Sequence, residues 1–404
     1  VQLTRGPSDD RAPCFRRDGA LGFLSNRSPR EGKPEEGDDE RSQVWLLPAE
    51  GGEARPLTDE PLGVSAFRFA RHADRLLLIA EVLPGVPHAE QRERAKDLKK
   101  NGPSALRYTR MPVRIWDHWL GPTAPHLITC DGEGGGRRDL TPGADYEHRE
   151  AEWDLSPDGR LAIITHRAPG EDRLDDIGLL LLDTSTGESW MLVKESRTTF
   201  GKPLFSPDSS RVASVRSERV PDAVGKPELW LHDLASGVGR SLTASWDRWP
   251  NPQGWTENGA ALLVTADDEG AVPVFTLDAE TGQVARLTNK ESGGTHDGMS
   301  AVPGRDFAVG IRGRTLHAPE PFRVSLRPGS EPSLLAGLSG FPAEEGAALA
   351  EWESHTVSSP DGTPVQFLVV RPRGEGPHPV LLWIHGGPIG QWSEGWHWRW
   401  NPLV

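Results

Sequence analysis

The chain has 404 residues and a mass of 44.2 kDa, which is long for one domain and typical of two or three. Its formal net charge of -14 argues against binding to nucleic acid or to an anionic membrane, and no apolar run approaches the roughly 20 residues that cross a bilayer. The two cysteines, Cys14 and Cys130, provide neither a disulfide framework nor a metal-ligand spacing, and we expect both to be buried, unreactive thiols.

The first residues, Val1-Gln2-Leu3-Thr4, lack both an initiator methionine and the pattern of a signal peptide. They match the end of a repeat unit better than the start of a protein. We therefore expect a piece of a longer polypeptide whose targeting signals lie outside these residues, with the cytoplasm as its expected location.

A repeat with a step of 50 residues runs through the centre of the chain, where turns of the Pro-Asp-Gly kind begin at residues 156, 206 and 256. The turns are Ser156-Pro157-Asp158-Gly159, Ser206-Pro207-Asp208-Ser209 and Thr256-Glu257-Asn258-Gly259, and apolar strands follow at 161–165, 212–215 and 261–265. A second strand in each unit ends in Asp183, Asp233 or Asp278, and Leu-Thr pairs close several units at 57–58, 140–141, 242–243 and 287–288.

Units of this size and pattern are typical of a β-propeller, in which each four-stranded sheet covers the exposed face of its neighbour. Weaker copies head further units at Arg17, His72 and Val302. We therefore predict a mostly β fold with a propeller over residues 1–340. Six heads are visible, and Leu3-Thr4 would end a truncated first blade, so we expect seven blades in the intact protein, with six and eight as alternatives.

The unit headed at His72 is too long, because its closing Leu140 lies 83 residues after Leu57. We place an insertion in this blade at about 84–120. Its segment 88–100 carries charges of both signs and is predicted to be a solvated helix.

The second half of the insertion, 111–119, is rich in aromatic residues. We expect a strand that packs the insertion onto its blade. A cation site built from Asp117 and His118 is the alternative.

The pattern changes after about residue 340, and 341–404 is predicted to open a second domain. A hairpin is expected around Ser359-Pro360-Asp361-Gly362. The apolar run Val380–Ile384, bounded by glycines, is typical of a strand buried on both faces of a parallel sheet. It stops at His385-Gly386-Gly387-Pro388, where two glycines allow a substrate to approach main-chain N–H groups.

A propeller that leads into this hairpin, strand and His-Gly-Gly-Pro turn resembles the prolyl oligopeptidase family of serine peptidases, above all its acylaminoacyl-peptidase and dipeptidyl-peptidase branches. The segments 112–119 and 396–402 are also similar to segments of bacterial members. The resemblance implies that 341–404 is the first part of an α/β-hydrolase domain. It implies that Gly387, with Gly386, offers a backbone N–H to the oxyanion hole, and that His385 and Pro388 fix the turn.

The same resemblance implies a Ser-Asp-His triad whose serine stands in a Gly-x-Ser-x-Gly elbow. No such elbow occurs in this sequence. No residue of the triad is therefore assigned in this chain, and we expect the triad downstream of residue 404. The remainder of the hydrolase domain is then a partner of this chain.

Charged residues at two places are candidates for substrate binding. Propeller peptidases can hold a peptide terminus with charges next to a blade-heading strand. Arg149 and Glu150 stand at such a place, with Glu152 beside them. A solvated loop is the alternative.

Arg399 is suited to bind a substrate carbonyl or carboxylate, or else to form a structural ion pair or a stack on a tryptophan. The nearby tryptophans at 392–400 would line an apolar pocket or pack a domain interface.

We therefore expect a serine peptidase of the acylaminoacyl-peptidase kind that hydrolyses short peptides, with the propeller as a size filter over the active site. The alternatives are release of dipeptides or C-terminal residues, an esterase with the same oxyanion hole, and a non-catalytic propeller that binds ligands. No cofactor and no metal is implied, short peptides are the expected substrate, and homo-oligomerisation is left open.

Overall fold

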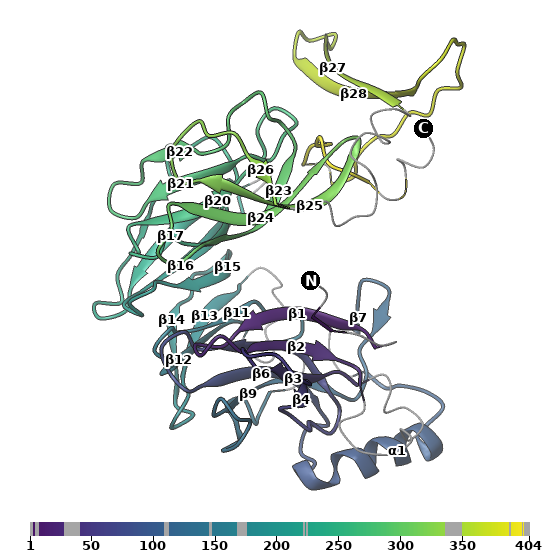
Figure 1. Cartoon of the computed structure of the whole chain (residues 1–404). Coiled ribbons are helices and arrows are strands. Elements are labelled where there is room, and N and C mark those ends of the chain that lie inside the picture. The colour runs from purple at the N-terminus through teal and green to yellow at the C-terminus, as the bar shows by residue number, and fades with distance from the viewer. Residues whose placement is uncertain are drawn as a thin grey trace. The chain divides into compact units, whose positions relative to one another are not determined.

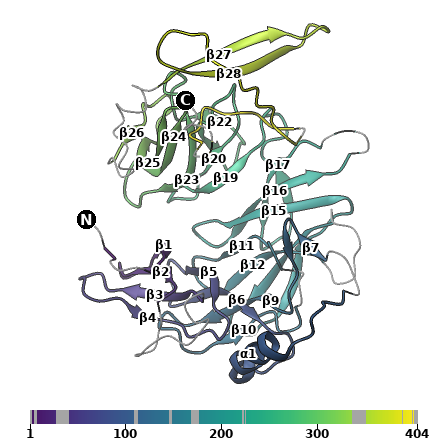
Figure 2. The same cartoon turned by 90° about the vertical axis from the view of Figure 1, so that its right-hand side faces the viewer.

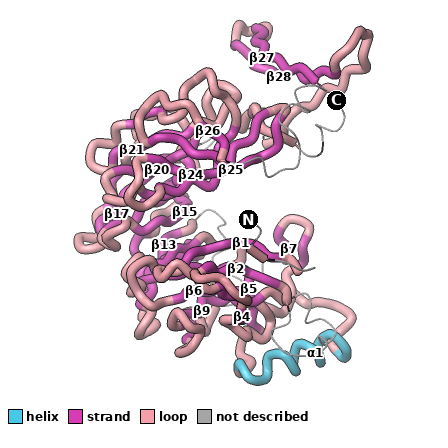
Figure 3. Tube along the Cα trace, viewed as in Figure 1, coloured by secondary structure: helices cyan, strands magenta, loops and turns pink. Residues whose placement is uncertain are grey.

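The structure, a computed structural model, describes residues 3–4, 8–27, 41–108, 113–144, 148–167, 176–220, 223, 225–335, 350–387, 389–397 and 399. Strands dominate it, in six sheets of four strands and two separate hairpins (Figures 1 and 2). The mostly β fold class is confirmed. Within these ranges α1 (Gln91–Asn101) is the one α-helix (Figure 3), and no helix is long and apolar enough to cross a bilayer.

Each four-stranded sheet is one propeller blade. The first three blades contain β1 (Asp10–Phe15), β2 (Leu21–Ser25), β3 (Gln43–Leu47) and β4 (Arg55–Pro56); β5 (Val64–Phe69), β6 (Leu76–Val82), β9 (Ala124–Cys130) and β10 (Arg138–Asp139); and β11 (Trp153–Leu155), β12 (Leu161–His166), β13 (Gly178–Asp183) and β14 (Ser189–Val193). The next three contain β15 (Thr198–Phe205), β16 (Arg211–Glu218), β17 (Glu228–Asp233) and β18 (Gly239–Ser241); β19 (Asn251–Trp255), β20 (Ala261–Thr265), β21 (Val274–Asp278) and β22 (Val284–Arg286); and β23 (Thr295–Ala301), β24 (Phe307–Arg314), β25 (His317–Ser325) and β26 (Ser333–Leu334).

Every predicted head leads into the second strand of a blade, namely β2, β6, β12, β16, β20 and β24. Leu3 and Thr4 lie outside any strand. The described part of the chain therefore has six blades, and a seventh blade in a longer protein stays a prediction.

The chain divides into two compact units, Val1–Gly225 with His232–Gly239 and Lys226–Leu231 with Arg240–Val404. The division falls within the fourth blade. The domain boundary predicted at 340 lies outside the described residues.

Neighbouring blades pack through alternate residues of one strand, as the period of two in a β-strand requires. In β6, Leu76 and Leu78 belong to a core shared with the first blade, whereas Leu77 belongs to a core shared with the third. In the second unit, Leu263 of β20 and Phe322 of β25 share a core in the same way. Both faces of a central strand are therefore buried, which explains the continuous apolar runs in the sequence.

The Leu-Thr pairs that close the units share one structural role. The leucine N–H donates to the carbonyl of a residue in the third strand, and the threonine hydroxyl accepts the N–H of that same residue. The third-strand residues, with the two donor–acceptor distances, are Val44 (2.8 and 3.0 Å), Leu127 (2.8 and 3.0 Å), Leu229 (2.8 and 2.8 Å) and Val274 (2.8 and 3.3 Å). All four leucines and all four threonines are buried. The pair thus satisfies buried backbone groups of the third strand directly after the short fourth strand ends.

Replacement of Thr243 by Val tests this role, because valine keeps the shape but removes the hydroxyl acceptor. The N–H of Leu229 is then buried without a partner, and we expect the free energy of unfolding to fall by about 1–3 kcal/mol. Urea and thermal unfolding measure the change. Thr243→Ser, which keeps the hydroxyl, serves as the control; an equal loss in both variants would show that the methyl group, not the hydrogen bond, matters.

The aspartates that end the third strands close tight turns. The Asp183 carboxylate accepts the Ser185 hydroxyl at 2.6 Å and the Thr186 N–H at 2.8 Å, and these bonds lower the pKa of Asp183 to about 2. In the Ser206–Ser209 turn, the Ser206 hydroxyl donates to Asp208 and lowers the pKa of that carboxyl group to about 2. The charged form of both carboxyl groups is therefore the one that stabilises the fold.

A pKa that is lower in the folded than in the unfolded state stabilises the protein above the unfolded value, about 4, and loses this effect as the pH falls towards 2. We therefore expect the melting temperature to fall between pH 5 and pH 3. The double variant Asp183→Asn/Asp208→Asn should melt lower than the wild type at pH 7 and lose less stability over that interval. Parallel pH profiles of the two proteins would contradict this assignment.

In the structure, the insertion lies between β6 and β9 of the second blade. It contains η1 (His88–Glu90), α1, and a hairpin of β7 (Arg114–Ile115) and β8 (His118–Trp119). The charged segment is a helix with only Gln91 buried, so the prediction of a solvated helix is confirmed.

The two cysteines are free. Cys130 is buried in β9, and desolvation raises the pKa of its thiol to about 12, so the prediction of an unreactive thiol is confirmed there. Cys14 in β1 is only half-buried, contrary to expectation.

The C-terminal part confirms one predicted element and contradicts another. β27 (Ala350–Ser358) and β28 (Pro364–Pro372) form the expected hairpin, which turns at Ser359–Gly362. The buried strand predicted at Val380–Ile384 is wrong, because this segment has no strand structure and Val380 is 93% exposed. A strand needs neighbours to satisfy its backbone groups, and the described residues place none beside this segment.

Candidate functional site

The hairpin β7–β8 presents aromatic side chains to solvent. Trp116, at its turn, is 88% exposed and has a left-handed φ of 54°, and Trp119 is also exposed. Trp119 is braced by Tyr108, whose ring stacks 6.1 Å away, and by Arg114, whose guanidinium lies 5.9 Å from its ring centroid. The prediction that this segment packs the insertion onto the blade through its aromatic residues is therefore wrong. A two-residue strand pair has too little surface to bury two indole rings.

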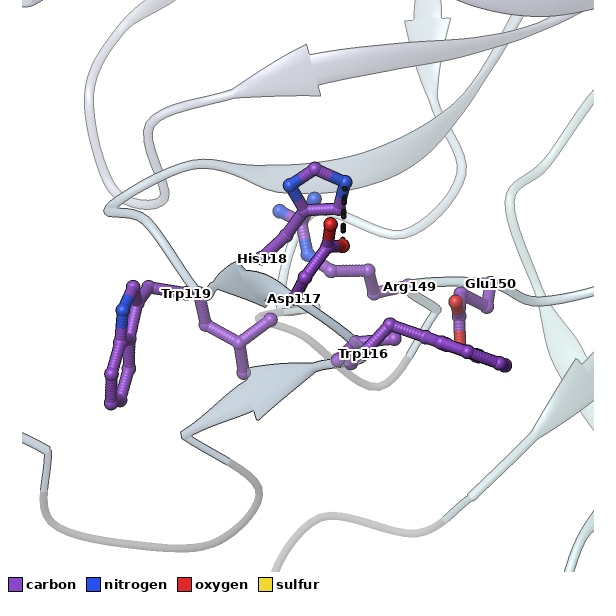
Figure 4. Close-up of a pocket in the computed structure, with 8 residues that line it drawn as sticks. Trp116, Asp117, His118, Trp119, Arg149 and Glu150 are labelled. Atoms are coloured by element: carbon purple, nitrogen blue, oxygen red, sulfur yellow. Dashed lines mark ion pairs between the residues drawn. The ribbon is translucent and has the colours of Figure 1, made fainter.

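The hairpin and the segment before β11 together line a cavity of about 540 Å³ (Figure 4). The lining residues are Ile115, Trp116, Asp117, His118, Trp119, Leu120, Arg149 and Glu150. The structure thus brings the predicted pair Arg149–Glu150 together with the insertion. Sequence reasoning missed the tryptophans as lining residues, because an apolar run gives no sign of whether its rings face a core or a cavity.

Arg149 is held in place from both ends of the insertion. Its two terminal nitrogens lie 3.4 Å from the carboxylate oxygens of Glu81 in β6, and one of them donates to the carbonyl of Thr123 at 2.6 Å. Glu81 compensates most of the guanidinium charge. Arg149 is therefore a fixed part of the cavity wall.

Glu150 is exposed and has φ 62°, a left-handed backbone conformation that side chains other than glycine adopt at a cost. Glu150 therefore stands at a strained position in the cavity wall, and such positions cluster at functional sites.

Asp117 and His118 form an ion pair of 3.2 Å, drawn as the dashed line in Figure 4, and both are largely exposed. Within the described ranges, no group of three or more histidine, cysteine, aspartate or glutamate side chains is arranged to hold a metal ion. The pair therefore contributes polar groups to the rim of the cavity and, with the other described residues, does not make a metal site.

His148 lies directly before Arg149 and is buried, with its Nε2 3.3 Å from Nδ1 of His166. Burial lowers the pKa of His148 to about 4, so this ring is neutral at neutral pH. The charged residues that line the cavity are then Asp117, which is paired with His118, Arg149, which is paired with Glu81 of β6, and Glu150. Among the described residues that line the cavity, Glu150 is the carboxylate without an ion pair, so the cavity favours a cationic ligand group beside Glu150.

Glu152, the third charged residue of this segment, has a structural role. Its carboxylate accepts the N–H of Lys202 in β15 at 2.6 Å, where the strand bulges with a φ of 50°. A Cβ on the neighbouring Gly201 would lie 2.7 Å from the same carboxylate oxygen. Glu152 is therefore a link between the third and fourth blades and does not line the cavity.

The predicted oxyanion turn lies in the second unit. His385, Gly386 and Gly387 are in irregular backbone, Gly387 has φ 138°, and His385 Nδ1 lies 3.1 Å from the Gly386 carbonyl. Pro388, Trp398 and Trp400 lie outside the described residues. The N–H of Arg399 donates to His397 Nδ1 at 3.3 Å. The roles assigned to the turn and to Arg399 stay predictions.

No family model matches the chain. Among curated proteins, it is 24% identical over 397 residues to dipeptidyl-peptidase 5 of Arthroderma otae, which covers 89% of this chain and 53% of that protein. It is 27% identical over 336 residues to dipeptidyl-peptidase 5 of Trichophyton schoenleinii, with 74% and 45% covered. The chain thus spans about half the length of these relatives.

Solved structures share the fold. An acylaminoacyl peptidase in complex with Z-Gly-Gly-Phe-chloromethyl ketone matches with a TM-score of 0.71 at 13% identity, over 98% of this chain and 56% of that one. The Pyrococcus horikoshii acylaminoacyl peptidase matches with a TM-score of 0.69 at 13% identity, over 98% and 63%.

These relatives define the class of the protein: a β-propeller chain related to serine peptidases of the prolyl oligopeptidase family. More narrowly, its sequence homologues are dipeptidyl-peptidases 5, which confirms the predicted relationship.

The strained backbone at Glu150 predicts that glycine is tolerated there better than at an ordinary site. Release of the left-handed strain, worth about 1–2 kcal/mol, offsets the roughly 0.5–1 kcal/mol that glycine costs in unfolded-state entropy. We therefore expect Glu150→Gly to keep or slightly raise the melting temperature. Glu188→Gly, at an exposed site with ordinary φ, is the control and should lower it. Equal losses in the two variants would show that Glu150 is not strained.

Proposed function

We propose that this chain is the propeller part of a serine peptidase that removes short units from the free amino end of peptides. The observation that carries the proposal is the exposed Glu150 carboxylate in a cavity lined by two tryptophans, in a chain whose homologues are dipeptidyl-peptidases. An α-ammonium group would bind Glu150 through a charge-assisted hydrogen bond and lie against an indole ring. An acylated amino end lacks this charge, so the proposal favours dipeptide release over the acylaminoacyl specificity expected from sequence.

The catalytic step is assigned to the hydrolase portion. In the proposal, Gly387 offers its backbone N–H to the oxyanion that develops when a serine outside these residues attacks the peptide carbonyl. His385 and Pro388 shape this turn. The propeller admits short peptides and excludes folded proteins.

The activity is tested on the complete protein with three peptide series: free amino end, acetylated amino end, and free carboxyl end with a blocked amino end. We expect turnover of the first series, with dipeptides as product, and covalent labelling by a fluorophosphonate probe. Preference for the acetylated series would instead favour acylaminoacyl-peptidase activity. Absence of both turnover and labelling would favour a non-catalytic propeller that binds ligands.

The cavity is tested by binding. Glu150→Gln should weaken the binding of a peptide with a free amino end by about tenfold or more, because a charge-assisted hydrogen bond is worth about 1.5–3 kcal/mol. Binding of the acetylated peptide should not change. Isothermal titration on the 404-residue chain measures both affinities.

Glu188→Gln removes one charge at an exposed site outside the cavity lining and is the matched control. An equal loss of affinity in both variants would mean that the overall charge, and not Glu150, attracts the peptide.

A further inference from the structure

The loop between β20 and β21 forms a rigid turn, Asp268–Ala271. Asp268 and Ala271 donate their N–H groups to each other's carbonyls at 2.9 and 3.0 Å. The Asp268 carboxylate is also ion-paired to Arg248 at 2.7 Å and to Arg286 at 2.6 Å. The backbone of this turn is therefore held by both its own bonds and two cations.

A second loop, Ser292–Gly294, is tied to the first. Val272 donates its N–H to the Gly294 carbonyl at 3.0 Å, and His296 donates to the Val272 carbonyl at 3.1 Å. Arg312, which is 8% exposed, donates to the carbonyls of Ser292 and Gly293. We call the Asp268–Ala271 turn and this loop together the loop platform.

The segment that follows the His385–Gly387 turn binds the backbone of this platform. The side-chain amide of Gln391 accepts the Gly270 N–H and donates to the Ala271 carbonyl, both at 3.0 Å, as a peptide group of a paired strand would. Glu394 donates its own N–H to the Gly270 carbonyl at 2.7 Å, and its carboxylate accepts the Gly294 N–H at 2.9 Å.

Glycines make this approach possible. Gly270 and Gly294 have φ of 86° and 85°, which is unfavourable for other residues. A Cβ on Gly293 would lie 2.4 Å from the Glu394 carboxylate, and one on Gly395 would lie 3.1 Å from Thr295. Glycines in both the loop platform and the segment that binds it therefore let the two backbones come close enough to form these hydrogen bonds.

We propose that Gln391 and Glu394 are positioning residues: by binding the loop platform they fix the His385–Gly387 turn in place on the fifth and sixth blades. Only three residues lie between Gly387 and Gln391, so the anchor at Gln391 keeps Gly387 within roughly 14 Å of it. The catalytic consequence rests on the proposed peptidase function, whereas the anchoring does not.

Hydrogen exchange of the 404-residue chain tests the anchoring directly, because the amides of Gly270 and Gly294 are the donors. We expect Gln391→Ala to speed exchange at Gly270, and Glu394→Ala to speed it at Gly294, each about tenfold or more. Glu394→Gln keeps an oxygen acceptor and should preserve slow exchange at Gly294. Unchanged exchange at both glycines in the alanine variants would overturn the proposal.

The variant Gln391→Glu gives a pH-dependent readout. At neutral pH its carboxylate would face the Ala271 carbonyl and the exposed Asp267, with no proton to donate. Cleavage by a protease between residues 380 and 390 should therefore be faster than in the wild type. Protonation restores the donor, so this difference should shrink as the pH is lowered towards 5. A difference that does not depend on pH would contradict the assigned hydrogen bond.

In the complete protein, an anchored oxyanion turn predicts that Gln391→Ala lowers kcat about tenfold with little change in KM, since the turn acts on the transition state. Normal kcat in a variant with fast exchange at Gly270 would overturn the positioning role. The exchange measurements decide the anchoring whether or not the complete protein proves to be a peptidase.

Discussion

The fold depends on one constraint: a four-stranded sheet with two apolar faces is stable only when both faces are covered. Alternate residues of β6 contribute to two different cores, one on each side of their blade. The Leu-Thr pairs serve the same constraint at the backbone, because the short fourth strands leave N–H and C=O groups that buried threonines and leucines satisfy. Loss of one pair would therefore affect a blade's contact with its neighbour as well as its own edge.

The local parts of this fold could be predicted from the sequence. The Ser206–Ser209 turn and its relatives fold through hydrogen bonds among residues at most five apart, so their chemistry is visible in a short window. The strands that follow them and the charged helix of the insertion were predicted for the same reason. Val380–Ile384 shows the limit, because a continuous apolar run predicts burial only if partner strands are present, and the described residues supply none.

The candidate site was only partly visible in the sequence, because it depends on contacts over long separations. Arg149 and Glu150 were singled out as charges beside a blade-heading strand, but Glu81 and Thr123, which hold Arg149, lie 68 and 26 residues away from it. Glu152 looked equivalent to its neighbours in sequence, yet its partner is a backbone N–H 50 residues further on. The anchoring glutamine and glutamate gave no signal, since their partners are backbone groups and carry no side-chain pattern.

The bonds of Arg149 have a consequence for how the cavity can change. Glu81 lies just before the first residue of the insertion and Thr123 just after its last residue, so Arg149 links the two ends of the insertion. A longer or shorter insertion would move the β7–β8 turn that bears Trp116, whereas Glu150, in the segment before β11, would stay in the same position. The length of the insertion can therefore alter the position of the wall that bears Trp116, whereas the wall that bears Glu150 stays the same. Such a change would alter the width of the cavity without altering the position of its carboxylate.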